Sequence, residues 1–202
     1  MATAPGRVQS VPPEQLRRRV DNLKPGSYID DILMAQDSSL YRWPDRLDAV
    51  QVFVEPSSAA AQWDPAYLAL ARSAFLEWND AGFPLRFNFI YDSTRADIVL
   101  RWKERFAPED GQRIGVTERI HTKDFAIASA RIDIANHDST GRLIPTRMVG
   151  GTLRHEIGHA LGLNHANDQT SVMYRESAAT SISPSDRATL HLLYLIPPGS
   201  LR

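Results

Sequence analysis

Hydrophobic residues recur along this chain at two spacings, and each spacing predicts one type of secondary structure. In DAVQVFVE, the residues Val50, Val52 and Val54 share one face, because successive side chains of a strand point to opposite sides. Strand-like patterns of this kind cover residues 48–55, 85–91, 96–103, 114–122 and 128–136. These five segments supply enough strands for one sheet.

Helical spacing follows the first strand. Asp64 can cap a helix with Pro65 in its first turn, and Gly82 follows its end near Asp80. Its apolar stripe consists of Tyr67, Ala71, Ala74, Phe75 and Trp78. Helical patterns also cover residues 13–23, 146–162 and 183–194. In the last of these, Ser183 is the expected cap, with Pro184 at the first position and Asp186 completing a capping box.

The order of these elements predicts an α+β fold. A strand, a helix and a second strand in succession imply a parallel pair joined by a right-handed crossover. One of the segments 114–122 and 128–136 is expected to be an antiparallel edge, which makes the sheet mixed. No internal repeat interrupts this order, so the chain is expected to form one domain.

Composition narrows the functional classes. A net charge of -1 over 202 residues gives no field that would gather nucleic acid or anionic lipid. The chain contains no cysteine, so a metal can be held only by nitrogen and oxygen ligands. It shows neither a signal-peptide pattern nor an apolar run long enough to cross a membrane, so a soluble protein is expected.

Three of the six histidines lie within eleven consecutive positions of GGTLRHEIGHALGLNHANDQTSVMY. His155 and His159 are four residues apart, which on a helix directs both imidazoles to the same side. Gly162 can adopt a left-handed conformation, end the helix and bring His165 back toward the pair. Three imidazoles with one open position predict a catalytic zinc site, although histidines can also cluster on a helix by chance.

With these residues in view, HEIGHALGLNH resembles the extended zinc signature of the metzincin clan of metalloendopeptidases, HExxHxxGxxH. Met173 in SVMY resembles the methionine of the turn beneath the metal in that clan. The order of elements over residues 40–196 is most similar to the matrixins and their bacterial relatives. Two departures are Ala166, where matrixins usually have serine, and the residues after Tyr174, where they usually have proline.

The resemblance implies a zincin-like fold: a five-stranded mixed, twisted sheet with two long helices in an upper lobe, and a small lower lobe ending in a helix. The expected catalytic domain covers residues 43–196, with the upper lobe at 43–162 and the lower lobe at 163–196. Residues 1–42 are an expected N-terminal extension, and residues 197–202 a tail. The extension could be a pro-segment with Asp30 or Asp31 as an aspartate latch, although YIDDIL is equally consistent with a short helix packed on the sheet.

The resemblance also implies an endopeptidase with one catalytic Zn²⁺ held by His155, His159 and His165. Glu156 is the expected general base and acid, with Gly162, Met173 and Tyr174 in supporting roles. An extended protein or peptide substrate would pair with an edge strand formed by Gly115, Val116, Thr117, Glu118, Arg119 and Ile120. A secreted monomer that binds neither nucleic acid nor membrane is expected, with a cytoplasmic location as the alternative.

Three further alternatives stay open at this stage. The protein could be a zinc-containing binding or scaffolding module with negligible turnover, although an unliganded Glu156 beside the open position favours an enzyme. A second zinc site is a weaker hypothesis. It would use His121 and His137, with Asp124 and Asp138 nearby, but histidines on separate loops are usually surface residues. The acidic loops APED and NHDST could bind calcium, although neither has the regular ligand spacing of a calcium loop.

Overall fold

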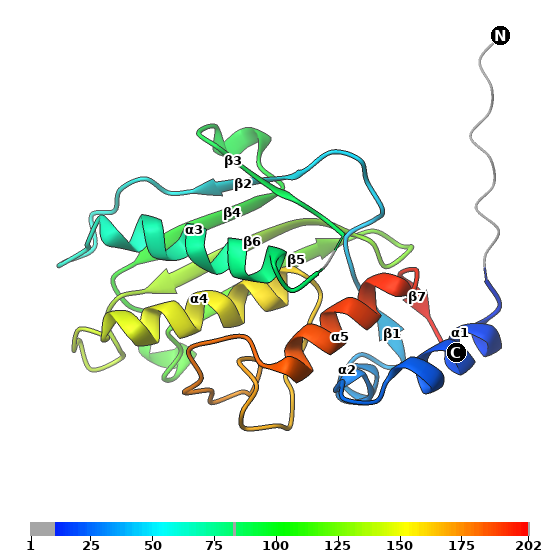
Figure 1. Cartoon of the computed structure of the whole chain (residues 1–202). Helices are drawn as coiled ribbons and strands as arrows, with labels where there is room; N and C mark the ends of the chain where they lie inside the picture. The colour runs from blue at the N-terminus through cyan, green and yellow to red at the C-terminus, as the bar shows by residue number, and fades with distance from the viewer. Residues whose placement is uncertain (1–10, 83, 202) are drawn as a thin grey trace, which may run out of the picture.

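A five-stranded sheet forms the centre of the molecule in the computed structural model, which describes residues 11–82 and 84–201 (Figure 1). Its strands lie in the order β3-β2-β4-β6-β5. They are β2 (Val50–Val54), β3 (Phe87–Ile90), β4 (Ile98–Lys103), β5 (Gly115–His121) and β6 (Ile127–Ala135). Each strand falls within, or within one residue of, a segment whose pattern predicted it.

The sheet is mixed. Strands β3, β2, β4 and β6 run parallel to one another, and β5 pairs antiparallel with β6. This arrangement confirms both the parallel pairing and the antiparallel edge expected from the sequence. Because β5 is the last strand in the order, its outer side lies free of any strand formed by the described residues, so peptide N–H and C=O groups are available there.

Two long helices cover one face of this sheet (Figure 1). Helix α3 (Ala66–Asn79) buries the predicted stripe, and its neighbour α4 (Thr146–Ala160) also contacts β5 and β6. The indole nitrogen of Trp78 donates a 2.9 Å hydrogen bond to the Arg154 carbonyl, which joins the two helices. The α+β fold with two long helices is therefore confirmed. Two short 3-10 helices, η1 (Ser93–Arg95) and η2 (Pro108–Asp110), lie in the connecting loops.

The remaining elements are grouped together beside the end of α4 (Figure 1). They are α1 (Pro13–Leu23), α2 (Ile29–Ala35), β1 (Ser39–Leu40), α5 (Pro184–Leu195) and β7 (Gly199–Ser200). Strand β1 pairs antiparallel with β7, and the Tyr28 N–H donates a 2.9 Å hydrogen bond to Thr189 on α5. The expected N-terminal extension and the expected tail therefore contact each other.

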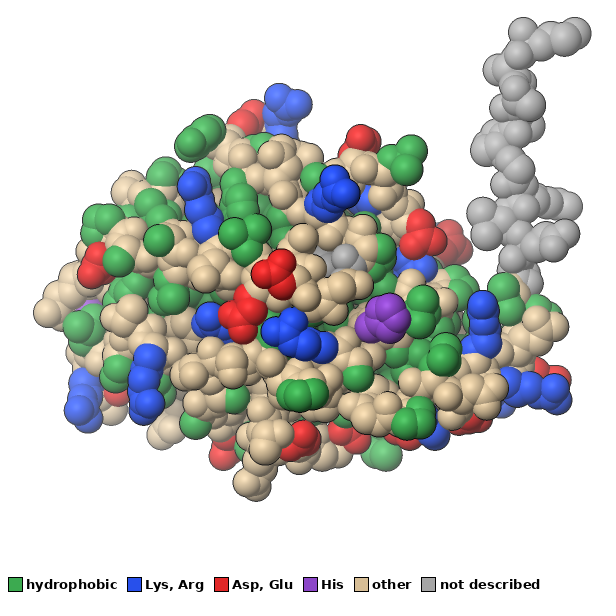
Figure 2. All heavy atoms as spheres, viewed as in Figure 1, with side chains coloured by type: hydrophobic (Ala, Val, Ile, Leu, Met, Phe, Trp, Pro, Cys, Tyr) green, Lys and Arg blue, Asp and Glu red, His purple; other side chains and the backbone are tan. Residues whose placement is uncertain are grey.

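The predicted domain boundaries stay predictions, and residues 1–10 of the expected extension and Arg202 of the tail lie outside the described residues. Within the described part of the chain, no helix has the length and apolar character needed to cross a lipid bilayer. In the view of Figure 2, basic side chains are interspersed with acidic ones, which agrees with a net charge near zero.

Candidate active site

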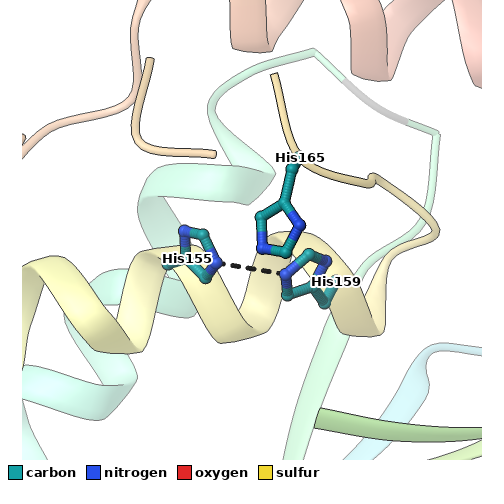
Figure 3. Close-up of side chains that lie close together, drawn as sticks. All are labelled: His155, His159 and His165. Atoms are coloured by element: carbon teal, nitrogen blue, oxygen red, sulfur yellow. Dashed lines mark hydrogen bonds between the residues drawn. The ribbon is translucent and has the colours of Figure 1, made fainter. Parts of the chain in front are cut away.

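Helix α4 and the bend after it bring three imidazole rings together (Figure 3). His155 and His159 project from the same side of α4, and His165 reaches them from the segment after Gly162. One ring nitrogen from each histidine lies within 4.8 Å of the other two. The ring centroids are 4.7 to 5.3 Å apart. The three histidines that are close in the sequence therefore form one cluster in space, as their spacing predicted.

Backbone carbonyls determine which nitrogen carries the proton in two of these rings. Nδ1 of His155 lies 2.7 Å from the Val172 carbonyl oxygen, and Nδ1 of His159 lies 3.0 Å from the Leu163 carbonyl oxygen. A carbonyl oxygen can only accept, so each Nδ1 carries the proton and donates it. Each neutral ring then presents an unprotonated Nε2, which is the form that binds a metal ion.

The two Nε2 atoms are 3.1 Å apart (Figure 3). Since neither carries a proton in the neutral rings, two lone pairs face each other across this distance. A cation between them removes that repulsion, and two zinc–nitrogen bonds of about 2.0–2.1 Å at a tetrahedral angle would place the nitrogens about 3.4 Å apart. The histidine cluster therefore fits a zinc site.

Burial keeps these imidazoles neutral. It lowers the pKa of His155 below its usual value and lowers the pKa of His159 further, with the neighbouring ring adding to the effect. Desolvation, followed by the charge of His155, lowers the pKa of His165 to about 4. Neutral imidazole is the ligand form, so the environment favours metal binding over protonation.

Gly162 shapes the bend that returns His165 to the helix. Its φ of 109° lies in the region that side chains rarely adopt. The Gly162 N–H donates to the His159 carbonyl, and the Leu163 N–H donates to the Gly158 carbonyl, both at 3.0 Å, which is the pattern of a Schellman helix end. A Cβ at Gly162 would collide with the Tyr41 carbonyl oxygen, so the space as well as the conformation requires glycine.

Glu156 lies beside the histidines with its side chain almost fully buried, at 5% exposure. Its Oε2 accepts a 2.6 Å hydrogen bond from the Thr117 hydroxyl on β5. Desolvation raises the pKa of Glu156 to about 7, against the smaller lowering effects of the Thr117 hydrogen bond and the Arg113 charge. The carboxylate is not one of the clustered ligand atoms, so it is placed next to the metal position rather than on it.

A turn formed by residues 171–174 lies under the metal position. Met173 is fully buried against Gly158 of α4, and the Ala166 N–H donates a 3.0 Å hydrogen bond to the Met173 carbonyl. The preceding residue, Val172, supplies the carbonyl that orients His155. Tyr174 is partly buried and closes the turn by donating its N–H to Ser171. The turn thus supports two of the three histidine positions.

Asp186, which the sequence identified only as part of a helix cap, also holds this turn. Its carboxylate accepts hydrogen bonds from the Ser171 hydroxyl and, at 3.0 Å, from the Val172 N–H. It also accepts from the Ser183 N–H at 2.8 Å, which completes the predicted capping box of α5. The sequence predicted only the capping box, which is local. The hydrogen bonds of Asp186 to residues 171–172 depend on how α5 packs and could not be predicted.

We expect Gly158→Ala to destabilise the protein by about 1–3 kcal/mol, because it adds a methyl group to a filled core. The new Cβ would collide with Met173 Sδ and lie 3.0 Å from Trp78. Urea unfolding measures the change. The matched control is Gly150→Ala on the same helix, where the flexible ends of Arg154 and Leu70 lie 3.2 and 3.3 Å from the new Cβ. An equal effect in both variants would contradict this packing argument.

The three histidines and Glu156 line a cleft with a volume of ≈ 750 Å³. Of the strand expected to bind substrate, Gly115, Val116 and Thr117 line this cleft, whereas Glu118, Arg119 and Ile120 continue β5 beyond it. The three residues that replace the matrixin pattern after Tyr174 also line the cleft, namely Arg175, Glu176 and Ser177. Arg113 and Asp110 also line the cleft. The sequence had singled out Asp110 only as part of the acidic APED loop, and Arg113 not at all.

The structure does not bring the proposed aspartate latch to the histidines. Asp31 accepts two hydrogen bonds from Asn167, at 3.0 Å from its N–H and 2.9 Å from its side-chain amide. Asp30 pairs with Lys24 at 3.0 Å. Neither carboxylate lines the cleft. YIDDIL begins helix α2, so these residues form the short helix of the alternative, but α2 packs mainly against α5 and β1 and not on the five-stranded sheet as expected.

The residues suggested for a second metal site are engaged elsewhere. The His121 ring packs on Tyr41 with centroids 4.5 Å apart. His137 is buried with its ring nitrogens 2.9 Å from the Asn136 and 3.1 Å from the Gln62 side-chain oxygens. Across residues 11–82 and 84–201, the only group of three or more potential ligands close enough for one ion is His155, His159 and His165. The second-site hypothesis therefore finds no support in this arrangement.

Comparisons with known proteins agree with this geometry. The model of the matrixin family matches residues 51–195, which include the three histidines, Met173 and the five-stranded sheet except its first residue, Val50. A protein of Heliothis virescens ascovirus 3e, an inferred matrix metalloproteinase, is 30% identical over 144 residues. That match covers 60% of this chain but only 29% of the viral protein, so the chain spans less than a third of that relative's length. Because the family model matches more than half of its residues, the chain belongs to the matrixin family.

Proposed function

We propose that this protein is a zinc-dependent endopeptidase that hydrolyses peptide bonds of extended protein or peptide substrates. One observation carries the proposal. The Nδ1–H groups of His155 and His159 donate hydrogen bonds to the Val172 and Leu163 carbonyls. The Nε2 lone pairs of the same two rings therefore lie 3.1 Å apart, beside His165. Membership of the matrixin family supports the same function. Secretion is part of the proposal, as the resemblance to matrixins implies.

His155, His159 and His165 would hold the zinc ion. When bound, zinc supplies a water of lowered pKa and polarises a carbonyl group. Glu156 would accept a proton from the attacking water on its carboxylate and donate it to the leaving amine. Its burial beside the cleft excludes bulk solvent from this proton transfer.

Substrate would bind along β5. The outer edge of this strand lies free of strand pairing by the described residues, and its first residues line the cleft beside Glu156. An extended peptide can add to such an edge through main-chain hydrogen bonds, which brings its carbonyl groups past the histidines. This geometry favours unfolded or loop segments of proteins as substrates.

Metal removal tests the proposal. We expect the protein to cleave casein or a quenched peptide, to lose this activity with a zinc chelator, and to regain it when Zn²⁺ is added in slight excess. Fluorescence of the quenched peptide measures the rate, and elemental analysis measures bound zinc. Chelator-insensitive cleavage would contradict the mechanism. One bound zinc per chain without cleavage across a peptide library would instead identify a binding module.

A further inference from the structure

Thr117 on β5 makes a double contact with Glu156 on α4, although the two residues are 39 positions apart. Its Oγ1 lies 2.6 Å from Oε2 of Glu156 and 2.9 Å from the backbone oxygen of the same residue. The contact is within the normal range for hydroxyl donors and is partly buried. One side chain of the edge strand is therefore attached to the expected general base.

The neighbouring position on the same face of β5 is shaped around this carboxylate. Residues 115 and 117 point to the same side of the strand, since side chains alternate. A Cβ at Gly115 would lie 2.6 Å from Oε1 of Glu156 and 2.7 Å from its Cγ. The strand thus leaves space for the carboxylate at Gly115 and provides a hydrogen bond to it at Thr117.

The hydrogen bond leaves one carboxylate oxygen uncommitted. Oε2 accepts from Thr117, whereas Oε1 accepts no hydrogen bond from the residues that the structure describes. Because Glu156 lines the cleft, this second oxygen is the one left for a reacting proton. Fixing one oxygen of a carboxyl group also fixes the plane in which the other lies.

We propose that Thr117 is a positioning residue that holds the Glu156 carboxylate in its catalytic orientation. This inference rests on the proposed peptidase function. It gives the Thr117 side chain a role distinct from the main-chain pairing with substrate expected of β5. The hydroxyl can both donate and accept. When Glu156 carries a proton on Oε2, that proton is donated to Oγ1 and the Thr117 proton goes to the backbone oxygen 2.9 Å away.

Two substitutions separate the hydroxyl from the shape of the side chain. Thr117→Val replaces the hydroxyl with a methyl group, and we expect kcat to fall about 10- to 100-fold, because a hydrogen bond to a charged group is lost and the carboxylate is free to rotate. Thr117→Ser keeps the hydroxyl, and we expect kcat within about threefold of the wild-type value. KM and bound zinc should be unchanged in both variants, since neither substitution alters the strand backbone or the histidines.

Steady-state kinetics on a quenched peptide, with zinc analysis and thermal unfolding of each variant, provide the test. The positioning role is supported if Thr117→Val lowers kcat without changing KM and Thr117→Ser keeps kcat near the wild-type value. An unchanged kcat in Thr117→Val overturns the inference, as does a rise in KM alone or a serine variant as slow as the valine variant. Absence of cleavage by the wild-type protein would reject the proposed function instead. Crystal structures of both variants then decide positioning, because the Glu156 carboxylate should turn away only in Thr117→Val.

Discussion

Glu156→Gln should lower peptide hydrolysis by about 10²- to 10⁴-fold, the usual contribution of a positioned acid–base group, and leave zinc bound. Glutamine has nearly the same shape as glutamate, and its amide oxygen can still accept the 2.6 Å hydrogen bond from Thr117. The amide cannot take up a proton at neutral pH, so the proton transfer assigned to Glu156 is lost. The values of kcat/KM and of bound zinc per chain measure the two parts of this expectation.

His159→Ala is the comparison variant. It removes a ligand and leaves two histidines, so we expect both zinc and activity to be lost. The glutamine variant should therefore retain its zinc, whereas the alanine variant should contain none. Proteolysis at the wild-type rate by Glu156→Gln would show that another group transfers the proton. Loss of zinc in that variant would show that Glu156 supports the metal.

The histidine cluster was predictable because its geometry is local. The spacing of His155 and His159 fixes their common side once a helix forms, and Gly162 identifies where the chain turns back. His165 lies only three residues beyond that turn. The signal therefore needed no knowledge of how distant segments pack.

The strands were predictable for a similar reason, since alternation along a strand reflects burial of one face. The pairing of β1 with β7 was not, because each strand has only two residues and carries no periodic signal. Residues 39–40 and 199–200 pair in a region where α5 packs against α2, and this packing joins segments from opposite ends of the chain. The sequence instead suggested a separable extension and tail.

The interactions that surround the site could also not be predicted from the sequence. Thr117 lies in a segment whose pattern predicts a strand, but the side chain it would contact depends on how α4 lies across the sheet. The resemblance to matrixins suggested an aspartate latch, and the structure pairs Asp31 with Asn167 instead. Both contacts are made between elements far apart in the chain, where periodicity carries no information.

Asp186→Ala should lower the free energy of unfolding by about 3–5 kcal/mol, one of the largest effects available outside the metal site. The carboxylate is fully buried and accepts from Ser171, Val172 and Ser183. Alanine would leave two buried N–H groups without an acceptor, and each costs about 1–3 kcal/mol. The N-cap hydrogen bond of α5 itself is retained, because the Ser183 hydroxyl accepts it from the backbone N–H of residue 186. Urea unfolding of the zinc-loaded and the zinc-free protein measures these losses.

The same substitution should also weaken zinc binding about 10- to 100-fold, because the Val172 carbonyl that orients His155 loses its support. Asp168→Ala is the matched control, since Asp168 accepts hydrogen bonds from Thr170 in the preceding loop but is exposed to solvent. It should change stability by less than about 1 kcal/mol, because water replaces the lost contacts. Similar effects of the two substitutions would mean that burial of Asp186 does not determine the stability of the turn. Loss of stability with unchanged zinc affinity would separate the helix cap from the orientation of His155.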